Sequence, residues 1–201
     1  MNRESNTDES PGSGTADDWA YVQRVQRGET EAFEILVLRH QKTIFNLVYR
    51  MLSDYDDATE TAQEVFLSAF KSIGQFRGES SFSTWLFRIA LNHASSRRKS
   101  VTSRQRLTVP LGGTEPIGGP FPDPAKFAER RQTQSLVQEA LNKLSPEHCE
   151  IIVLIDMQDV SYEEAAETIG IKVETVKTRL YRARQALKVQ LAPMFQERRR
   201  R

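Results

Sequence analysis

The residues most able to do chemistry are basic side chains near the C-terminal end of the sequence. Residues 172–201 hold ten lysines and arginines against two acidic residues. Such side chains can donate hydrogen bonds to base edges in the major groove of DNA and can hold phosphates. The group that one helix could present together is Lys177, Thr178, Arg179, Arg182 and Arg184. A plain helical hairpin with a solvated basic face is the alternative.

The residues before this basic group predict the turn that would position it. Ser161 and Glu164 have the spacing of a capping box, which starts a helix. Gly170 can take the left-handed backbone conformation that ends that helix. Small Ala166 at the helix crossing and apolar Val176 after the turn complete the pattern of a helix-turn-helix. The second helix would then carry the basic side chains, as in proteins that read DNA.

A longer helical region precedes this motif. Apolar residues recur at three- and four-residue steps between residues 17 and 99, and no segment alternates as a strand does. Gly28 separates a short first helix from a longer one, for which Thr30 is the expected N-cap. Asp56 or Asp57 is expected to cap the next helix. Ser81 or Ser83 is expected to cap the last one, in which Phe82 and Trp85 lie on the apolar stripe.

Two other segments are too poor in apolar periodicity to fold as helices. Residues 108–125 contain five prolines and four glycines, which favours an extended linker. Residues 1–16 are polar and acidic, which favours a disordered tail. The fold class predicted is therefore all-α, with two small helical domains joined by a Pro/Gly-rich linker.

The composition limits where the protein can work. The chain has 201 residues, a net charge of +1 and one cysteine, Cys149, so it has no internal disulfide. No apolar run approaches the roughly 18 residues of a membrane span, and the polar N-terminus does not resemble a signal peptide. A cytoplasmic protein with no direct membrane insertion is expected.

The sequence offers no convincing catalytic group. Its three histidines, His40, His93 and His148, are scattered, and neither an HExxH nor a CxxC motif occurs. His148 and Cys149 are neighbours, but two ligands do not make a zinc site. Glycine motifs for phosphates or dinucleotides are missing as well. We expect a protein that is not an enzyme, with no metal and no cofactor.

Several motifs together resemble one family. The segments are DATETAQEVFL (57–67), FRGESSFSTWLFRIALN (76–92), LSP (144–146), SYEEAA (161–166) and ETVKTRLYRAR (174–184). In this order they resemble the extracytoplasmic-function group of sigma-70 factors over residues 18–192. The resemblance implies region 2 over residues 18–103 and region 4 over residues 129–192. It leaves a linker at 104–128, an acidic tail at 1–17 and a basic tail at 193–201.

The resemblance implies that residues 57–67 form the helix that docks on core RNA polymerase. Acidic side chains and one apolar anchor at helical spacing can meet the basic clamp helices of the β′ subunit. The implied docking residues are Asp57, Glu60, Gln63, Glu64 and Phe66. From the residues alone, a solvated acidic face over a core that includes Phe66 is the favoured alternative. Thr59 departs from the family, many of whose members have an acid pair at Thr59-Glu60.

The second block implies recognition and melting of the promoter −10 element. A loop at 76–81 would accept an extruded base, and the helix after it would hold the single strand and its phosphates. The implied residues are Phe76, Arg77, Ser80, Ser81, Arg88, Asn92, Arg97 and Arg98. Asn92 could instead form a local cap. Ser96 stands where many members have Asp, so no role is assigned to it.

The helix-turn-helix would read the −35 element through Thr175, Lys177, Thr178, Arg179, Arg182 and Arg184. The implied partners are core RNA polymerase (β′ clamp helices and β flap), promoter DNA and a cognate anti-sigma factor. The linker would thread towards the polymerase active centre and the RNA exit path. Two other classes stay open from the residues: a free-standing dimeric helix-turn-helix regulator, and an enzyme acting on nucleic acid, for which no catalytic set can be assembled.

Overall fold

The computed structural model describes residues 14–105 and 136–198. All regular elements in these two ranges are helical, which confirms the all-α prediction. None of the described helices is both long and apolar enough to cross a membrane. Most of the predicted linker, 104–128, and most of the predicted N-terminal tail, 1–17, lie outside the described residues.

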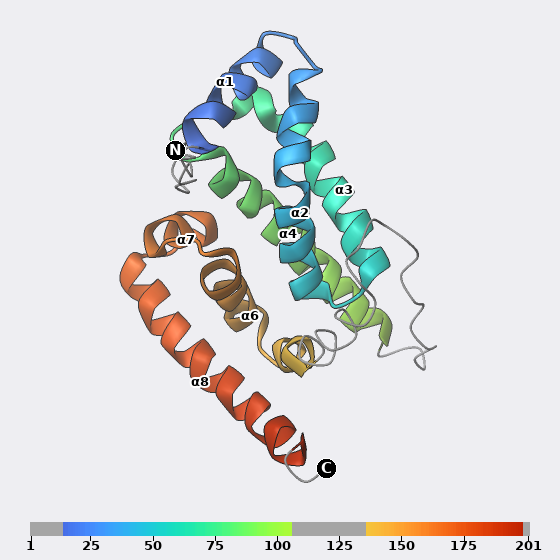
Figure 1. Cartoon of the computed structure of the whole chain (residues 1–201), viewed down its shortest axis with the longest axis vertical. Helices are drawn as coiled ribbons and strands as arrows, with labels where there is room; N and C mark the ends of the chain where they lie inside the picture. Colours follow the sequence, from blue (N-terminus) through green and yellow to red (C-terminus); the bar gives the residue numbers. More distant parts are fainter. Residues whose placement is uncertain (1–13, 106–135, 199–201) are drawn as a thin grey trace, which may run out of the picture.

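The first body, residues 14–105, is a bundle. It contains α1 (Gly14–Gln26), α2 (Ala32–Leu52), α3 (Tyr55–Ser72), the 3-10 turn η1 (Ile73–Gln75) and α4 (Phe82–Gln105). Helices α2, α3 and α4 pack on one another, and α1 crosses one end of them (Figure 1). Leu36, Leu47, Val65 and Leu86 are fully buried between them.

The helix ends in this body correct two of the predicted caps. Thr30 does not cap α2, whose N-cap position is Glu31 without a side-chain bond. The cap of α3 is Asp54, whose carboxylate accepts the Asp57 N–H at 2.8 Å. Ser53 in the left-handed conformation ends α2, so α3 begins at once and Asp56 and Asp57 both lie inside its first turn.

The second body, residues 136–198, contains the predicted helix-turn-helix. A helical segment at 136–142 is followed by α6 (Pro146–Ile152), the π-helical turn η2 (Val153–Met157), α7 (Tyr162–Ile169) and α8 (Val173–Arg198). Ser145 caps α6, and Pro146 after it takes the first helical position, where a proline is favoured. Ser161 and Glu164 form both bonds of the capping box, and Gly170 ends α7 at φ 76°.

Two predicted tails contain helix. The first helix, α1, begins at Gly14, within the range predicted as a disordered tail. At the other end α8 continues to Arg198 through Pro193, so the range predicted as a basic tail from 193 begins as helix. Tertiary packing of the neighbouring turns can extend a helix into a segment whose own composition does not favour it.

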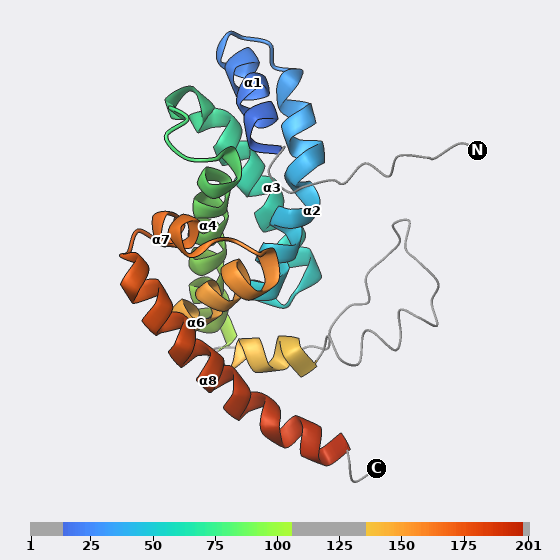
Figure 2. The same ribbon diagram turned by 60° about the vertical axis from the view of Figure 1, so that its left-hand side comes forward.

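The two bodies lie against each other. Helix α7 packs on α4, and η2 packs on α2, so the second body runs along one side of the first (Figures 1 and 2). Buried apolar side chains of both bodies form one continuous cluster. The sequence predicted two small domains joined by a linker. In the structure, the two bodies share one apolar core.

Candidate nucleic-acid interface

Helix α8 presents the predicted base-reading side chains to solvent. Its inner face is anchored by Val176, Leu180 and Ala183, all buried against the rest of the second body. The buried positions recur at helical spacing, so the positions between them face outward. Thr175, Lys177, Thr178, Arg182 and Arg184 are exposed and Arg179 is half-buried.

The exposed side chains of α8 fall into two groups. Arg184 donates from Nε to Asp156 at 3.0 Å, and this pairing raises the pKa of the Arg184 guanidinium. Arg179 lies 3.6 Å from the carboxylate of Glu147. Within the described residues, Lys177 and Arg182 make no hydrogen bond or ion pair through their side chains. Their donors are available to an anionic partner.

Tyr181 belongs to the same surface, and the sequence analysis missed it. Its side chain is 66% exposed on α8, four residues after Lys177. A ring this exposed on a helix is unusual, because aromatic side chains normally bury most of their area. Apart from its basic neighbours, no sequence signal distinguished Tyr181 from a core aromatic residue.

The predicted loop of the first body has a different geometry from the one expected. Phe76 is 6% exposed, and its ring centroid lies 5.1 Å from that of Trp85 and 5.8 Å from that of Trp19. The expectation that Phe76 offers an open ring to a base is therefore not met in this structure, since the ring is part of the aromatic core. Gly78, at φ 72°, lets Trp19 approach to 3.0 Å from where a Cβ would stand.

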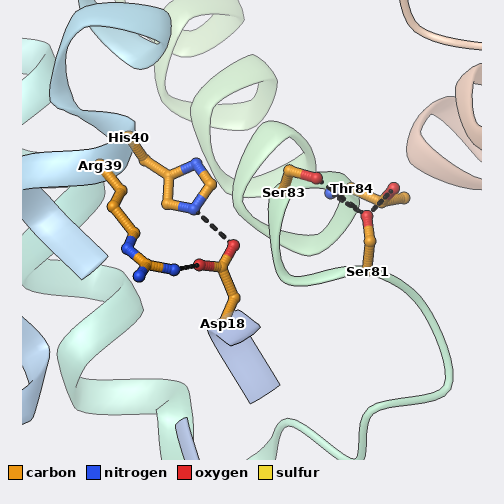
Figure 3. A network of polar contacts seen from close by, with 6 residues as sticks. All are labelled: Asp18, Arg39, His40, Ser81, Ser83 and Thr84. Atoms are coloured by element: carbon orange, nitrogen blue, oxygen red, sulfur yellow. Dashed lines mark hydrogen bonds and ion pairs between the residues drawn. The ribbon is translucent and has the colours of Figure 1, made fainter. Parts of the chain in front are cut away.

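Ser81 has a structural role at the start of α4. Its hydroxyl accepts the Thr84 N–H at 3.0 Å, which confirms one of the two predicted caps, and it also contacts the hydroxyls of Ser83 and Thr84 (Figure 3). Phe82 is 2% exposed and Trp85 half-buried, so both pack in the core as expected. Around this cap, Arg77 remains exposed and Ser80 half-buried.

A buried ion pair fastens α1 beside this loop. Asp18 is 5% exposed and lies 2.8 Å from His40 Nε2 and 3.1 Å from Arg39 Nη1 (Figure 3). Burial alone would raise the pKa of Asp18, but hydrogen bonds and charge from His40 and Arg39 outweigh it and hold that pKa below its usual range. No sequence signal predicted this role for Asp18, which lies at the start of the range assigned to region 2.

The three predicted phosphate-binding arginines of α4 all have intramolecular partners. Arg97 donates to Asp57 at 2.9 Å and also contacts Glu60. Arg88 donates to the carbonyl of Glu167 at 2.7 Å, and Arg98 donates to two carbonyls of the second body. Asn92, one turn after Arg88, is exposed.

The predicted docking helix α3 presents a mixed face. Glu60 and Gln63 are exposed, while Glu64 is half-buried and lies 3.4 Å from His93 Nδ1. The Arg97 contacts bring Asp57 and Glu60, assigned to docking, against an arginine assigned to DNA. The structure therefore joins two sites that the sequence analysis treated separately.

The exposed apolar side chains of α3 are not the residue predicted for docking. Phe66 is half-buried and packs against the core, as the alternative interpretation held. Leu67 and Phe70 are instead 54% and 39% exposed on α3. Phe66 and Leu67 differ in exposure because a one-residue step rotates a side chain by about 100° around the helix.

The described residues contain no group of three or more His, Cys, Asp or Glu that could hold a metal ion.

Family profiles match both bodies. Residues 36–104 match sigma-70 region 2, and residues 134–187 match sigma-70 region 4. The RNA polymerase sigma-H factor of Pseudomonas aeruginosa is 32% identical over 196 residues, covering 90% of this chain and 96% of that protein. The extracytoplasmic-function (ECF) sigma factor SigW of Bacillus subtilis is 33% identical over 178 residues, covering 85% and 94%.

Two solved structures share the fold. CnrH in complex with the cytosolic domain of CnrY superposes with a TM-score of 0.65 at 25% identity, over 87% of this chain and 96% of that chain. The sigma factor RpoE of Bartonella quintana, in complex with the anti-sigma factor NepR, gives a TM-score of 0.63 at 24% identity, over 80% and 96%.

Proposed function

The chain belongs to the extracytoplasmic-function group of the sigma-70 family, and from this premise we propose how its parts work. It is a transcription initiation factor that binds core RNA polymerase and directs it to promoters. We assign residues 18–103 to core docking and −10 recognition, and residues 129–192 to −35 recognition. The face of α8 with unpaired Lys177 and Arg182 carries the DNA part of this proposal.

At the −35 element, the N-terminal half of α8 enters the major groove. Thr175, Lys177 and Arg182 face outward and are free to reach base edges or phosphates. Thr178 already donates to the carbonyl of Glu174 at 2.9 Å, and Arg179 and Arg184 are oriented by acidic partners. We therefore assign base reading to the first three side chains and backbone positioning to the arginines that are already paired.

At the −10 element, recognition rests on the exposed residues around the start of α4. Arg77, Ser80 and Asn92 are accessible, whereas Phe76 and Ser81 support the loop from within. An extruded base needs stacking and polar contacts to offset the lost stacking in the duplex, a cost of a few kcal/mol. Half-exposed Trp85 can supply an aromatic edge once the loop opens.

Helix α3 is the docking face for the β′ clamp helices, and the second body is assigned to the β flap. The docking residues are acidic Asp57, Glu60 and Glu64, together with Gln63 and the exposed apolar Leu67. An apolar side chain surrounded by acids suits a partner that is basic around an apolar core.

The remaining assignments follow the family. The protein is not an enzyme and uses no cofactor, because its contribution is binding energy directed to two promoter elements. We place it in the cytoplasm with the polymerase.

The structures of CnrH and RpoE were solved with partners, and the partner of RpoE, NepR, is an anti-sigma factor. We propose that an anti-sigma factor binds this chain too. The linker at 104–128 would thread towards the polymerase active centre.

Run-off transcription tests the proposed function. The chain is purified with bacterial core polymerase and supplied with a promoter library. Co-elution with core, and new start sites that share two spaced elements, support a sigma factor. Binding to duplex DNA without association with core would instead indicate a free-standing regulator.

A further inference from the structure

Helix α1 holds the start of the loop that the proposed function assigns to the −10 element. The side-chain amide of Gln26, the last residue of α1, donates to the Ile73 carbonyl and to the Phe76 carbonyl, each at 2.8 Å. The Ile73 carbonyl also accepts the Phe76 N–H at 3.1 Å, which closes the turn η1. Both donors of the Gln26 amide are therefore used at the two ends of the turn from which the loop leaves.

The loop has few contacts of its own. Among the described residues, positions 77–80 make no backbone–backbone hydrogen bond, and positions 77–79 are exposed. At the far end of the loop, the Ser81 hydroxyl accepts the Thr84 N–H and fixes the start of α4 (Figure 3). The shape of the loop therefore depends on what holds its two ends, and Gln26 supplies the side-chain hydrogen bonds at the first end.

A second side chain of α1 covers the middle of the loop. Two ring atoms of Trp19 lie 3.0 Å from the position that a Cβ on Gly78 would take, so the absence of a side chain there makes room for the indole. The Trp19 ring also meets the Phe76 ring edge-on, with centroids 5.8 Å apart. Helix α1 is itself fixed to α2 by the contact of Asp18 with His40 (Figure 3). The loop therefore rests against a helix that is held in place.

Gln26 is placed for a positioning role rather than for core packing. The residue is exposed, and it lies before the part of the chain, 36–104, that matches sigma-70 region 2. An exposed side chain adds little apolar burial, so its main contribution here is the pair of directed hydrogen bonds to a segment 47 and 50 residues away in sequence.

We infer that Gln26 is a positioning residue for −10 recognition, which fixes the turn before the loop so that opening for an extruded base is confined to residues 77–80. The inference rests on the proposed role of that loop. A loop held at both ends loses less conformational freedom when a base binds than a loop whose start also moves. Arg77 and Ser80 then stay where a base that enters the loop can reach them.

Binding of non-template-strand oligonucleotides to the assembled polymerase tests this role. The full chain is combined with core polymerase, and fluorescence anisotropy measures the affinity for a labelled oligonucleotide that carries the −10 element. Each base of the element is replaced in turn by an abasic site, and the position at which the wild type loses most affinity marks the captured base. Gln26→Ala removes the amide, and Gln26→Glu keeps its size but has no donors. Gln41→Ala, at an exposed glutamine of α2, is the matched control.

We expect the preference of the wild type for the intact over the abasic oligonucleotide to fall about tenfold in both Gln26 variants, as for the loss of two hydrogen bonds. The preference should stay unchanged in Gln41→Ala. Because both oligonucleotides meet the same protein, the ratio cancels effects of a variant on folding, polymerase assembly or net charge. An unchanged preference in either Gln26 variant would overturn the inference, whether or not overall affinity falls. If the wild type itself gains no affinity from any −10 base, the proposed base capture is wrong, and that result is read without any variant.

Discussion

Lys177 and Arg182 differ from Arg179 and Arg184, two other arginines of α8, because no acceptor among the described residues holds them. Arg179 and Arg184 lie near Glu147 and Asp156, so part of their charge is already compensated. A free guanidinium or ammonium group loses only water when it binds DNA, whereas a paired one must also give up its partner. The unpaired side chains are therefore the better candidates for contacts that depend on base sequence.

Replacing Lys177 or Arg182 by Ala should weaken binding to the −35 element by about 1–3 kcal/mol if either reads a base. Fluorescence anisotropy with the selected promoter and with single-base variants measures this. Arg184→Ala serves as the comparison. If the loss is the same on every sequence and the salt dependence becomes shallower, the residue contacts phosphate instead.

Leu67 and Phe66 are adjacent in sequence but have different environments. Leu67→Ala should leave the thermal unfolding of the protein nearly unchanged, since the side chain is 54% exposed, and should weaken core polymerase binding by roughly 1–2 kcal/mol. Val189→Ala, a similarly exposed aliphatic change on α8, is the control. Phe66→Ala is expected to lower stability. Full polymerase affinity in Leu67→Ala would remove this residue from the docking face.

At the scale of elements, α1 is held by a charged contact as well as by apolar packing. Asp18 ties α1 to α2 through His40 and Arg39, and Trp19 next to it packs on Phe76. The same helix thus supports both the bundle and the loop before α4. Breaking a buried pair from one side leaves its partner's charge uncompensated, so the contact is sensitive to substitution.

Asp18→Asn should lower the free energy of unfolding by about 1–3 kcal/mol at neutral pH, as expected for hydrogen bonds to a charged group. The pKa of Asp18 is lowered in the folded protein, so its contribution is present above the unfolded value near 4 and fades as pH falls through the folded pKa. Urea unfolding of both proteins between neutral and acidic pH measures this. A stability difference that stays constant down to low pH would contradict it.

At the scale of the whole molecule, the two bodies share one apolar cluster. Elements that bury surface against each other unfold together when the shared contact is a large part of their stability. Small domains gain the most from such sharing, because each one buries a limited core of its own. The two bodies are therefore expected to unfold as one cooperative unit.

Calorimetry should accordingly show one unfolding transition for the wild-type chain, with equal calorimetric and van't Hoff enthalpies. Gln138 is buried and donates to the Arg50 carbonyl and to Ser53 Oγ across the contact between the bodies. Gln138→Ala should broaden or split that transition, while Gln185→Ala, at an exposed position of α8, should not. Two separate transitions in the wild type would mean that the bodies are thermodynamically independent.

The sequence by itself determined the features that depend on local pattern. The capping box at Ser161, the left-handed Gly170 and the all-α class follow from short-range spacing, and the structure has all three. Helix caps and turns are decided by a few neighbouring residues, so they can be predicted without knowledge of the fold. The order of the motif blocks likewise identified the family.

Only the tertiary structure decided which side chains remain available for binding. Phe76 is buried among the aromatic residues of α1 and α4, Arg97 bridges to α3, and Arg88 and Arg98 hold the second body. Phe82 and Trp85 are near Phe76 in sequence, but Trp19 and the partners of the three arginines are distant. Burial and ion pairing depend on the distances between elements, and the same local sequence pattern is compatible with both an exposed and an occupied side chain.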